Sequence, residues 1–169
     1  MLLAVLFELV RNGEFVSEFS SEKICYFLQR FGAKEHFKLD YKPNFYGPYS
    51  GKVKYVINYL NGSYIMGYSS MDKKPFETLD LVSDGFEKVE GYILSKPELV
   101  EIVNRTELFL DGFYSEFALE LLSTVDYISL NKDTFDLEII KSELESWSER
   151  KRTLFSNDRF LNISINHLR

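Results

Sequence analysis

The sequence predicts an α+β fold that is mostly α-helical, with a winged-helix-like N-terminal part that carries a small β-hairpin and a helical C-terminal part. Apolar residues recur at helical spacing through most of the chain. Two short apolar runs on either side of a polar turn indicate a hairpin. Apolar residues make up 45% of the 169 residues, which suits one buried core. We therefore expect a single domain over residues 1–169, with the winged-helix-like part in 1–82 and the helical part in 83–169.

The N-terminal part is predicted to open with two helices and a strand. Apolar residues at the i, i+3, i+4 and i+7 positions indicate a helix over residues 1–11, ended by an Asn-Gly pair. A second helix opens at Ser20 or Ser21, whose hydroxyl can accept a hydrogen bond from a free amide, and Gly32 closes it. Residues 36–41 alternate apolar and polar side chains, as a strand does.

A third helix and a hairpin complete this part. Residues 42–51 are rich in turn formers, and the helix that follows extends over residues 49–60. Residues 64–68 and 76–82 read as two strands, joined by a polar turn over 69–75. Two helices, a strand, a helix and a hairpin form the element order of a winged-helix-like module.

The C-terminal part reads as helices from residue 83 onward. Residues 95–98 combine a capping box with a proline in the first turn of a helix that ends at an Asp-Gly pair. Another helix carries apolar residues over 113–125. Asp133 or Thr134 is expected to cap the next helix, and Ser156 the last one.

Acidic residues concentrate in the middle of the chain. Residues 1–75 carry 10 basic and 7 acidic side chains, residues 76–149 carry 5 and 18, and residues 150–169 carry 5 and 1. Such an acidic segment repels phosphate backbones and attracts basic surfaces, although solvated helix faces would give the same composition. The acidic residues that we expect on a partner-binding surface are Glu98, Glu101, Glu107, Asp111 and Glu116.

An aromatic turn precedes the third predicted helix. Gly47 permits a sharp turn there, and Pro48 sets the backbone for the first helical residue. Two interpretations stay open for Phe45, Tyr46 and Tyr49. They either hold the third helix against the second, or they anchor a macromolecular partner.

Patterns that carry catalysis or bind metals do not occur in the sequence. The two histidines, His36 and His167, lie far apart, and Cys25 stands among apolar neighbours as a core residue would. No glycine-rich phosphate loop is present. We therefore expect no catalytic residue, no metal, no cofactor and no small-molecule substrate, and a protein that binds a macromolecule and is not an enzyme.

The compartment follows from the cysteine count and the apolar runs. One cysteine gives no disulfide framework, which favours a reducing compartment. The longest near-continuous apolar run, residues 2–7, is far shorter than a membrane span. A cytoplasmic protein without a membrane partner is expected.

DNA is the alternative partner. Basic residues near the third helix and the hairpin, interleaved with aromatics, could hold phosphates and stack bases. The residues in question are Lys52, Lys54, Lys73 and Lys74.

Several motifs together resemble the C-terminal domain of DarG-type antitoxins. They are the run from Lys23 to Gln29, the Tyr-Gly-Pro-Tyr of residues 46–49, the helix end from Asn58 to Ile65, and the run from Trp147 to Phe155. The order and spacing of these motifs cover almost the whole chain. A similar Tyr-Gly-Pro pattern occurs in the wider set of SocA-like, or Panacea, antitoxin domains.

The resemblance implies a role in a toxin–antitoxin system. DarG-type proteins join an N-terminal macro domain, which removes ADP-ribose from DNA, to a C-terminal domain that binds the DarT toxin, a DNA ADP-ribosyltransferase. We accordingly expect a domain excised from a longer chain with a macro domain. Its acidic, DNA-mimicking surface would occupy the DNA site of a DarT-like toxin. The alternative is a winged-helix DNA-binding regulator of a toxin–antitoxin operon.

Overall fold

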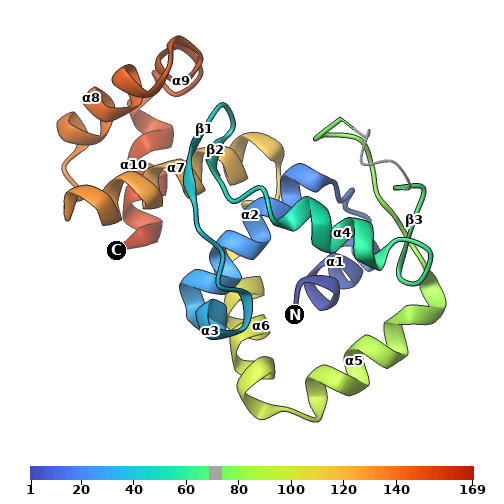
Figure 1. Cartoon of the computed structure of the whole chain (residues 1–169). Helices are drawn as coiled ribbons and strands as arrows, with labels where there is room; N and C mark the ends of the chain where they lie inside the picture. The colour runs from blue at the N-terminus through green and yellow to red at the C-terminus, as the bar shows by residue number, and fades with distance from the viewer. Residues whose placement is uncertain (69–73) are drawn as a thin grey trace. The chain divides into compact units, whose positions relative to one another are not determined.

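The computed structural model describes residues 1–68 and 74–169, which form two compact units (Figure 1). Unit 1 consists of Met1–Tyr41 and Ser50–Tyr114, and unit 2 of Lys42–Tyr49 and Ser115–Arg169. The described residues are α-rich and include small antiparallel β-pairs, which confirms the predicted fold class at this level. None of their helices has both the length and the apolar character needed to cross a membrane. The single-domain organisation and the winged-helix-like arrangement stay predictions.

Unit 1 is built around a helix that is buried along nearly its whole length. The elements of the unit are α1 (Leu2–Arg11), α2 (Glu18–Leu28), a π-helix (Gln29–Ala33), α3 (Lys34–Phe37), α4 (Val53–Leu60), β3 (Ile65–Met66), β4 (Asp80–Leu81), a 3₁₀ turn (Ser83–Gly85), α5 (Phe86–Leu94) and α6 (Pro97–Leu110). Helices α1, α4 and α6 pack against α2, which is therefore the centre of the unit.

The second helix begins earlier than predicted. Its cap is Ser17, whose hydroxyl accepts a hydrogen bond from the backbone N–H of Ser20 (3.1 Å). The Ser20 hydroxyl accepts in return from the N–H of Ser17 (2.8 Å). The prediction of Ser20 or Ser21 as the cap was wrong because Ser20 belongs to the first turn and closes a reciprocal capping box.

The predicted strand over residues 36–41 was also wrong. Gly32 adopts a φ of +134°, but the chain forms a π-helix across it and continues as α3. Lys38, with a φ of +50°, ends α3 in the left-handed region. The side-chain amide of Gln29 then pairs with the backbone N–H and C=O of Leu39, each at 2.8 Å, and these bonds hold a non-strand segment in place.

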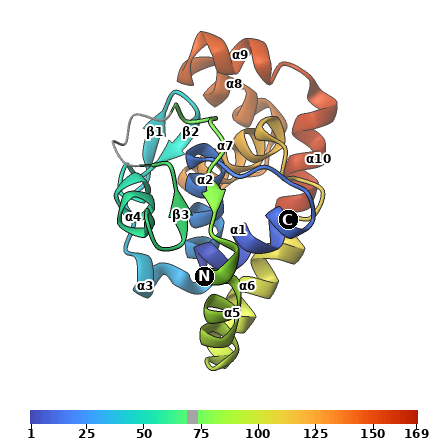
Figure 2. The same ribbon diagram turned by 90° about the vertical axis from the view of Figure 1, so that its right-hand side faces the viewer.

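The hairpin that follows α4 is confirmed in outline (Figure 2). Ile65 of β3 lies opposite Leu81 of β4, and the two strands are antiparallel. Helix α4 begins at Val53, later than the predicted residue 49. Residues 69–73, most of the predicted turn, lie outside the described residues.

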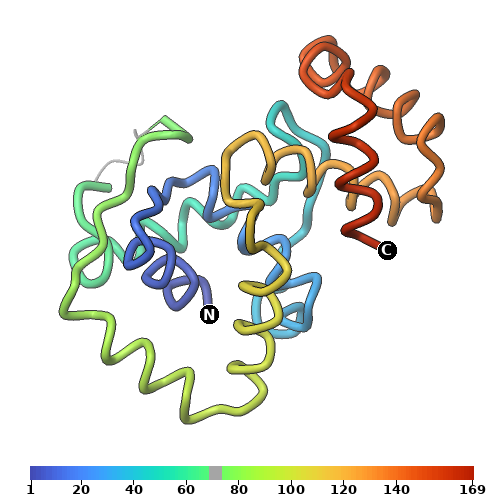
Figure 3. Tube along the Cα trace, turned by 180° about the vertical axis from the view of Figure 1, so that it is seen from behind, coloured from blue at the N-terminus to red at the C-terminus, as the bar shows by residue number. Residues whose placement is uncertain are grey.

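Unit 2 combines a hairpin from the first half of the chain with the last helices. Its elements are β1 (Lys42–Asn44), β2 (Gly47–Tyr49), α7 (Glu116–Lys132), α8 (Leu137–Trp147), α9 (Glu149–Leu154) and α10 (Asp158–Leu168). Helices α8 and α10 pack against α7 (Figure 3). The core consists of Leu121, Val125, Ile128, Ile140, Leu144, Phe155, Leu161 and Ile165.

The three helix caps predicted in the C-terminal part each lie one to three residues beyond the predicted positions. Helix α8 is capped by Asp136, not by Asp133 or Thr134, and α10 by Asn157, not by Ser156. The expected capping box before α6 does not form, because Lys96 occupies the cap position without a side-chain bond. In each case the last polar residue before the helix takes the cap position.

A buried carboxylate fixes the loop that leads into α4. Glu22 of α2 is 2% exposed and accepts hydrogen bonds from the backbone N–H groups of Ser50 (3.4 Å) and Gly51 (3.3 Å). Burial raises the pKa of Glu22 to about 7, although the two N–H groups and Lys23 act in the opposite direction. The ionised form is therefore less favourable in the folded protein than in the unfolded chain.

We predict that Glu22→Gln changes how stability depends on pH. A carboxyl with a raised pKa in the folded state contributes stability that is fully present below its unfolded pKa, 4.5, and lost as pH rises through about 7. The free energy of unfolding of Glu22→Gln, relative to that of the original protein, should therefore increase by about 3 kcal/mol from pH 4 to pH 8. Urea unfolding at a series of pH values measures the difference. The matched control is Glu35→Gln, at an exposed glutamate of α3, and a pH-independent difference for Glu22→Gln would contradict this account.

Candidate functional site

Two motifs that are about a hundred residues apart in sequence meet in unit 2. The first is the β1–β2 hairpin, in which Asn44 pairs with Gly47 across the Phe45-Tyr46 turn. Gly47 has a φ of +94°, which a residue with a side chain rarely adopts. The Asn44 side-chain oxygen accepts a hydrogen bond from the N–H of Phe45 (2.6 Å), which tightens the turn.

The second motif is the corner between α8 and α9. The indole Nε1–H of Trp147, the last residue of α8, donates to the backbone oxygen of Asn44 at 2.9 Å. Ser148 caps α9, because its hydroxyl accepts from the N–H of Lys151 (3.1 Å). The hairpin and the corner are thereby joined through a single backbone carbonyl.

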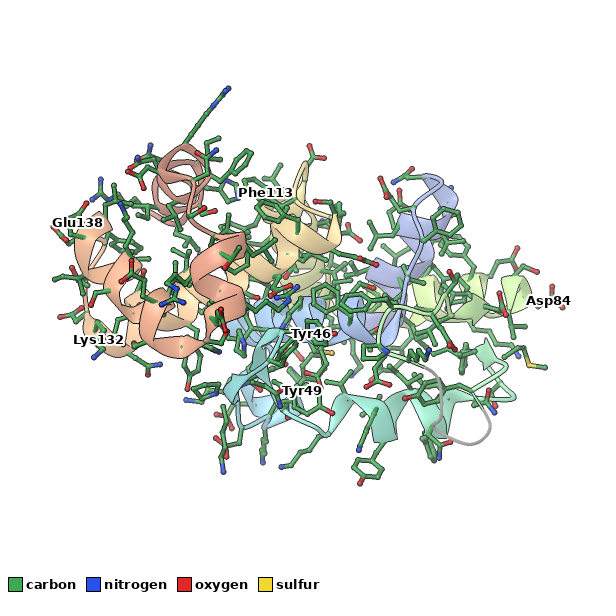
Figure 4. All side chains as sticks on the ribbon, turned by 90° about the horizontal axis from the view of Figure 1, so that it is seen from above. Tyr46, Tyr49, Asp84, Phe113, Lys132 and Glu138 are labelled. Carbon is green, nitrogen blue, oxygen red and sulfur yellow. The ribbon has the colours of Figure 1, made fainter. Side chains whose placement is uncertain are left out.

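Arg150 lies against the aromatic turn. Its guanidinium carbon is 5.2 Å from the ring centroid of Phe45 and 5.0 Å from that of Tyr46. The two rings are perpendicular, with centroids 4.8 Å apart. Figure 4 shows Tyr46 and Tyr49 on the hairpin. Because guanidinium groups are attracted to aromatic faces, Arg150 stabilises the turn that contains Phe45 and Tyr46.

A buried carboxylate of α7 holds Arg150 in this position. Glu120 pairs with Arg150 through both oxygens, one of them 3.0 Å from Nη2, and also accepts from the ammonium of Lys151. The side chains of Glu120 and Lys151 are 3% and 0% exposed, while that of Arg150 is 31% exposed. We call Phe45, Tyr46, Glu120, Arg150 and Lys151 the Arg150 cluster.

The Arg150 cluster has two cations and one anion. Burial lowers the pKa of Lys151 to about 8, while the hydrogen bond and the charge of Glu120 act against this shift. Lys151 also lies 4.9 Å from the centroid of the Phe155 ring. A net positive charge therefore lies beneath a partly exposed aromatic turn.

A groove opens beside the cluster. It has a volume of about 560 Å³, within the range of about 300–1,000 Å³ that is usual for ligand sites. Its lining residues are Pro43, Asn44, Phe45, Glu143, Ser146, Trp147 and Ser148. We call it the Trp147 groove.

Unit 1 contains a smaller, acidic depression of about 150 Å³. Glu8, Glu90 and Glu107 line it, and burial, with a smaller effect from the charge of Glu8, raises the pKa of Glu107. A raised carboxyl pKa suits a general acid. The depression is nonetheless small for a ligand site, and its three carboxylates would repel an anionic substrate.

The predicted aromatic residues come together, whereas the predicted acidic residues are divided between the units. Phe45, Tyr46 and Tyr49 all belong to the hairpin, and Phe45 is 54% exposed. The acidic residues Glu98, Glu101, Glu107 and Asp111 lie on α6 or at its end in unit 1, while Glu116 lies in the first turn of α7 in unit 2. All of them are exposed except Glu107, which is half-buried.

The lysines of the DNA alternative lie in unit 1. Lys52 precedes α4 and is exposed, Lys54 lies in its first turn, and Lys74 is exposed before β4. Lys73 lies outside the described residues. Among residues 1–68 and 74–169, no group of His, Cys, Asp and Glu side chains could hold a metal ion. Cys25 is buried, as predicted for a core residue, and burial raises the pKa of its thiol.

Sequence reasoning missed Glu120, Arg150 and Trp147 as members of one site. A glutamate between Leu119 and Leu121 on a helix was the available signal, because a carboxylate inside an apolar run is rarely buried without a partner. The partner itself could not be identified, since it lies 30 residues further along the chain.

No family model matches the sequence. Three curated proteins are similar to it, all named DNA ADP-ribosyl glycohydrolase. The relative from Thermus aquaticus is 28% identical over 141 residues, which cover 83% of this chain and 38% of the relative. The relatives from Mycobacterium bovis and Mycobacterium tuberculosis are each 21% identical over 149 residues, which cover 85% of this chain and 42% of theirs. The chain thus spans about two fifths of the length of these relatives.

These relatives correct the expected function. The leading expectation was a toxin-neutralising antitoxin domain that mimics DNA, the alternative was a DNA-binding regulator, and neither was an enzyme. All three relatives are named DNA ADP-ribosyl glycohydrolase, the name of an enzyme. These names contradict the expected antitoxin, toxin-inhibitor and DNA-mimic roles and the expectation of a protein that is not an enzyme. The coarser part of the resemblance is confirmed, because the chain is similar to DNA ADP-ribosyl glycohydrolases at low identity.

We predict that Glu120→Leu destabilises the protein by about 3–5 kcal/mol, because it leaves the buried ammonium of Lys151 without its counter-charge. The double variant Glu120→Leu/Lys151→Met should recover a large part of this loss, since Arg150 can reach water. Urea unfolding of the single and double variants gives the coupling free energy. Glu116→Leu, at an exposed position of the same helix, is the control, and additive effects of the two substitutions would refute the charge pairing.

Proposed function

We propose that this chain acts in a DNA ADP-ribosyl glycohydrolase and contributes the surface that holds the modified DNA strand. The observation that carries the proposal is the similarity to three curated proteins of that name over more than four fifths of the chain. Because the chain spans about two fifths of those proteins, we assign it substrate binding and leave the hydrolytic groups unassigned.

The charge distribution of unit 2 supports this assignment. Residues 150–169, which include α10 and most of α9, carry 5 basic and 1 acidic side chains. Arg152 and Arg159 are exposed there, and Arg150 lies under the aromatic turn. DNA is held through phosphate contacts with arginine and lysine, and single strands also through stacking on aromatic rings. A cytoplasmic location and a macro domain elsewhere in the native protein remain predictions.

We expect the 169-residue chain to bind a fluorescein-labelled single-stranded oligonucleotide that carries ADP-ribose, with an affinity that falls as salt increases. Arg152→Glu and Arg159→Glu should each weaken binding by roughly tenfold, since each replaces an attractive phosphate contact by a repulsive one. Fluorescence anisotropy at two salt concentrations measures the dissociation constant.

Arg11→Glu is the matched control, because Arg11 is an exposed arginine at the end of α1 in unit 1. Mass spectrometry of the same mixture detects free ADP-ribose. Release would add hydrolysis to the chain's own activities, and salt-dependent binding without release supports the substrate-binding role. A chain that neither binds nor cleaves the oligonucleotide would disprove the proposal.

A further inference from the structure

The Trp147 groove has the size and composition of a site for a flat ring with polar edges. One wall is the hairpin, with Pro43, Asn44 and Phe45, and the other is the end of α8, with Ser146 and Trp147. The groove is open to solvent, so a ligand can place a ring there without a conformational change of the protein. Trp147 also packs against the core of unit 2 and is fixed by its bond to Asn44, which makes this wall rigid.

Phe45 supplies a stacking surface at the edge of the groove. More than half of its side chain is exposed although it is a large apolar group, and Arg150 keeps it in place. The guanidinium lies near the rings of both Phe45 and Tyr46, and the second cation of the cluster, Lys151, is buried beside Glu120. An exposed aromatic ring backed by a cation is the arrangement on which proteins stack unpaired bases.

Polar groups complete the groove. The hydroxyl of Ser146 donates to the backbone oxygen of Glu143 (2.9 Å), so its lone pairs can accept from a ligand. The carboxylate of Glu143 pairs with Lys132 at 2.8 Å, which reduces its repulsion of a nearby phosphate. Figure 4 shows Lys132 on its helix. Hydrogen-bond acceptors thus line the same groove as the aromatic wall.

We propose that the Trp147 groove holds one unpaired nucleobase of the bound DNA strand, stacked on Phe45, while neighbouring phosphates contact the basic side chains of α9. The proposal rests on the DNA-strand contact under Proposed function and adds the chemical group that the groove recognises. Stacking is tolerant of base identity, so the groove accepts any of the bases.

The chain contains its own probe for this groove. Trp147 is the one tryptophan in the sequence, so the intrinsic tryptophan fluorescence comes from the groove wall alone. Titration with a 12-residue oligothymidylate should quench it, and titration with an abasic deoxyribose-phosphate 12-mer of the same charge should not. The abasic strand should also bind roughly tenfold more weakly, the loss expected when one stacked base is removed.

The decisive variant is Phe45→Ala. We expect it to weaken oligothymidylate binding by roughly tenfold and to leave binding of the abasic strand unchanged, because the phosphate contacts persist. The control is Tyr59→Ala, which removes an aromatic ring of unit 1 that is 86% exposed. Far-UV circular dichroism establishes that both variants are folded.

The outcomes separate this inference from the proposed function. Equal, salt-dependent affinity for the two strands, without quenching of Trp147, would leave the DNA contact intact and overturn the nucleobase site. An absence of binding to either strand at low salt would overturn the DNA contact itself. A tenfold preference for the strand with bases that is lost in Phe45→Ala supports both.

Discussion

One buried carboxylate, Glu120, determines the arrangement of the candidate site. A carboxylate that is almost fully buried needs compensation, and Glu120 receives it from two consecutive cations at the start of α9. Pairing with Lys151 fixes the helix against α7. Pairing with Arg150 directs the guanidinium toward Phe45 and Tyr46. The exposed turn of the hairpin thus rests on Arg150, a partly exposed cation that the buried Glu120 holds in position.

Glu22 and Glu120, the two glutamates that are buried among the described residues, are stabilised in different ways. Glu22 accepts hydrogen bonds from two backbone N–H groups and keeps a raised pKa, so its charge changes with pH near neutrality. Glu120 instead forms ion pairs with the side chains of Arg150 and Lys151. The first arrangement ties a loop of unit 1 to its central helix, and the second orders a surface. Both cost desolvation energy, but only the second places charge next to a groove.

Sequence patterns within a few residues predicted the elements that are determined by interactions between neighbouring residues. Helices α1 and α6 follow from apolar periodicity and from the Asn-Gly and Asp-Gly pairs that end them. The β1–β2 hairpin was not predicted, because Pro43 and Pro48, which lie opposite each other, remove hydrogen-bond donors that a strand would use. The hairpin's bond to Trp147 spans 103 residues, and the pairing of Glu120 with Arg150 spans 30. A short stretch of sequence does not indicate contacts between residues so far apart.

The discontinuity of unit 2 has a consequence for the newly made chain. A ribosome completes Met1 to Tyr114 while the hairpin of residues 42–49 still lacks the helices against which it packs. Phe45 and Tyr46 therefore stay without their packing partners until Trp147 and Arg150 have been synthesised. Contact of these two residues with the hairpin then closes a loop of about a hundred residues. Unit 2 completes its fold after unit 1, and a chain interrupted after residue 114 would expose the aromatic turn to aggregation or to binding by a chaperone.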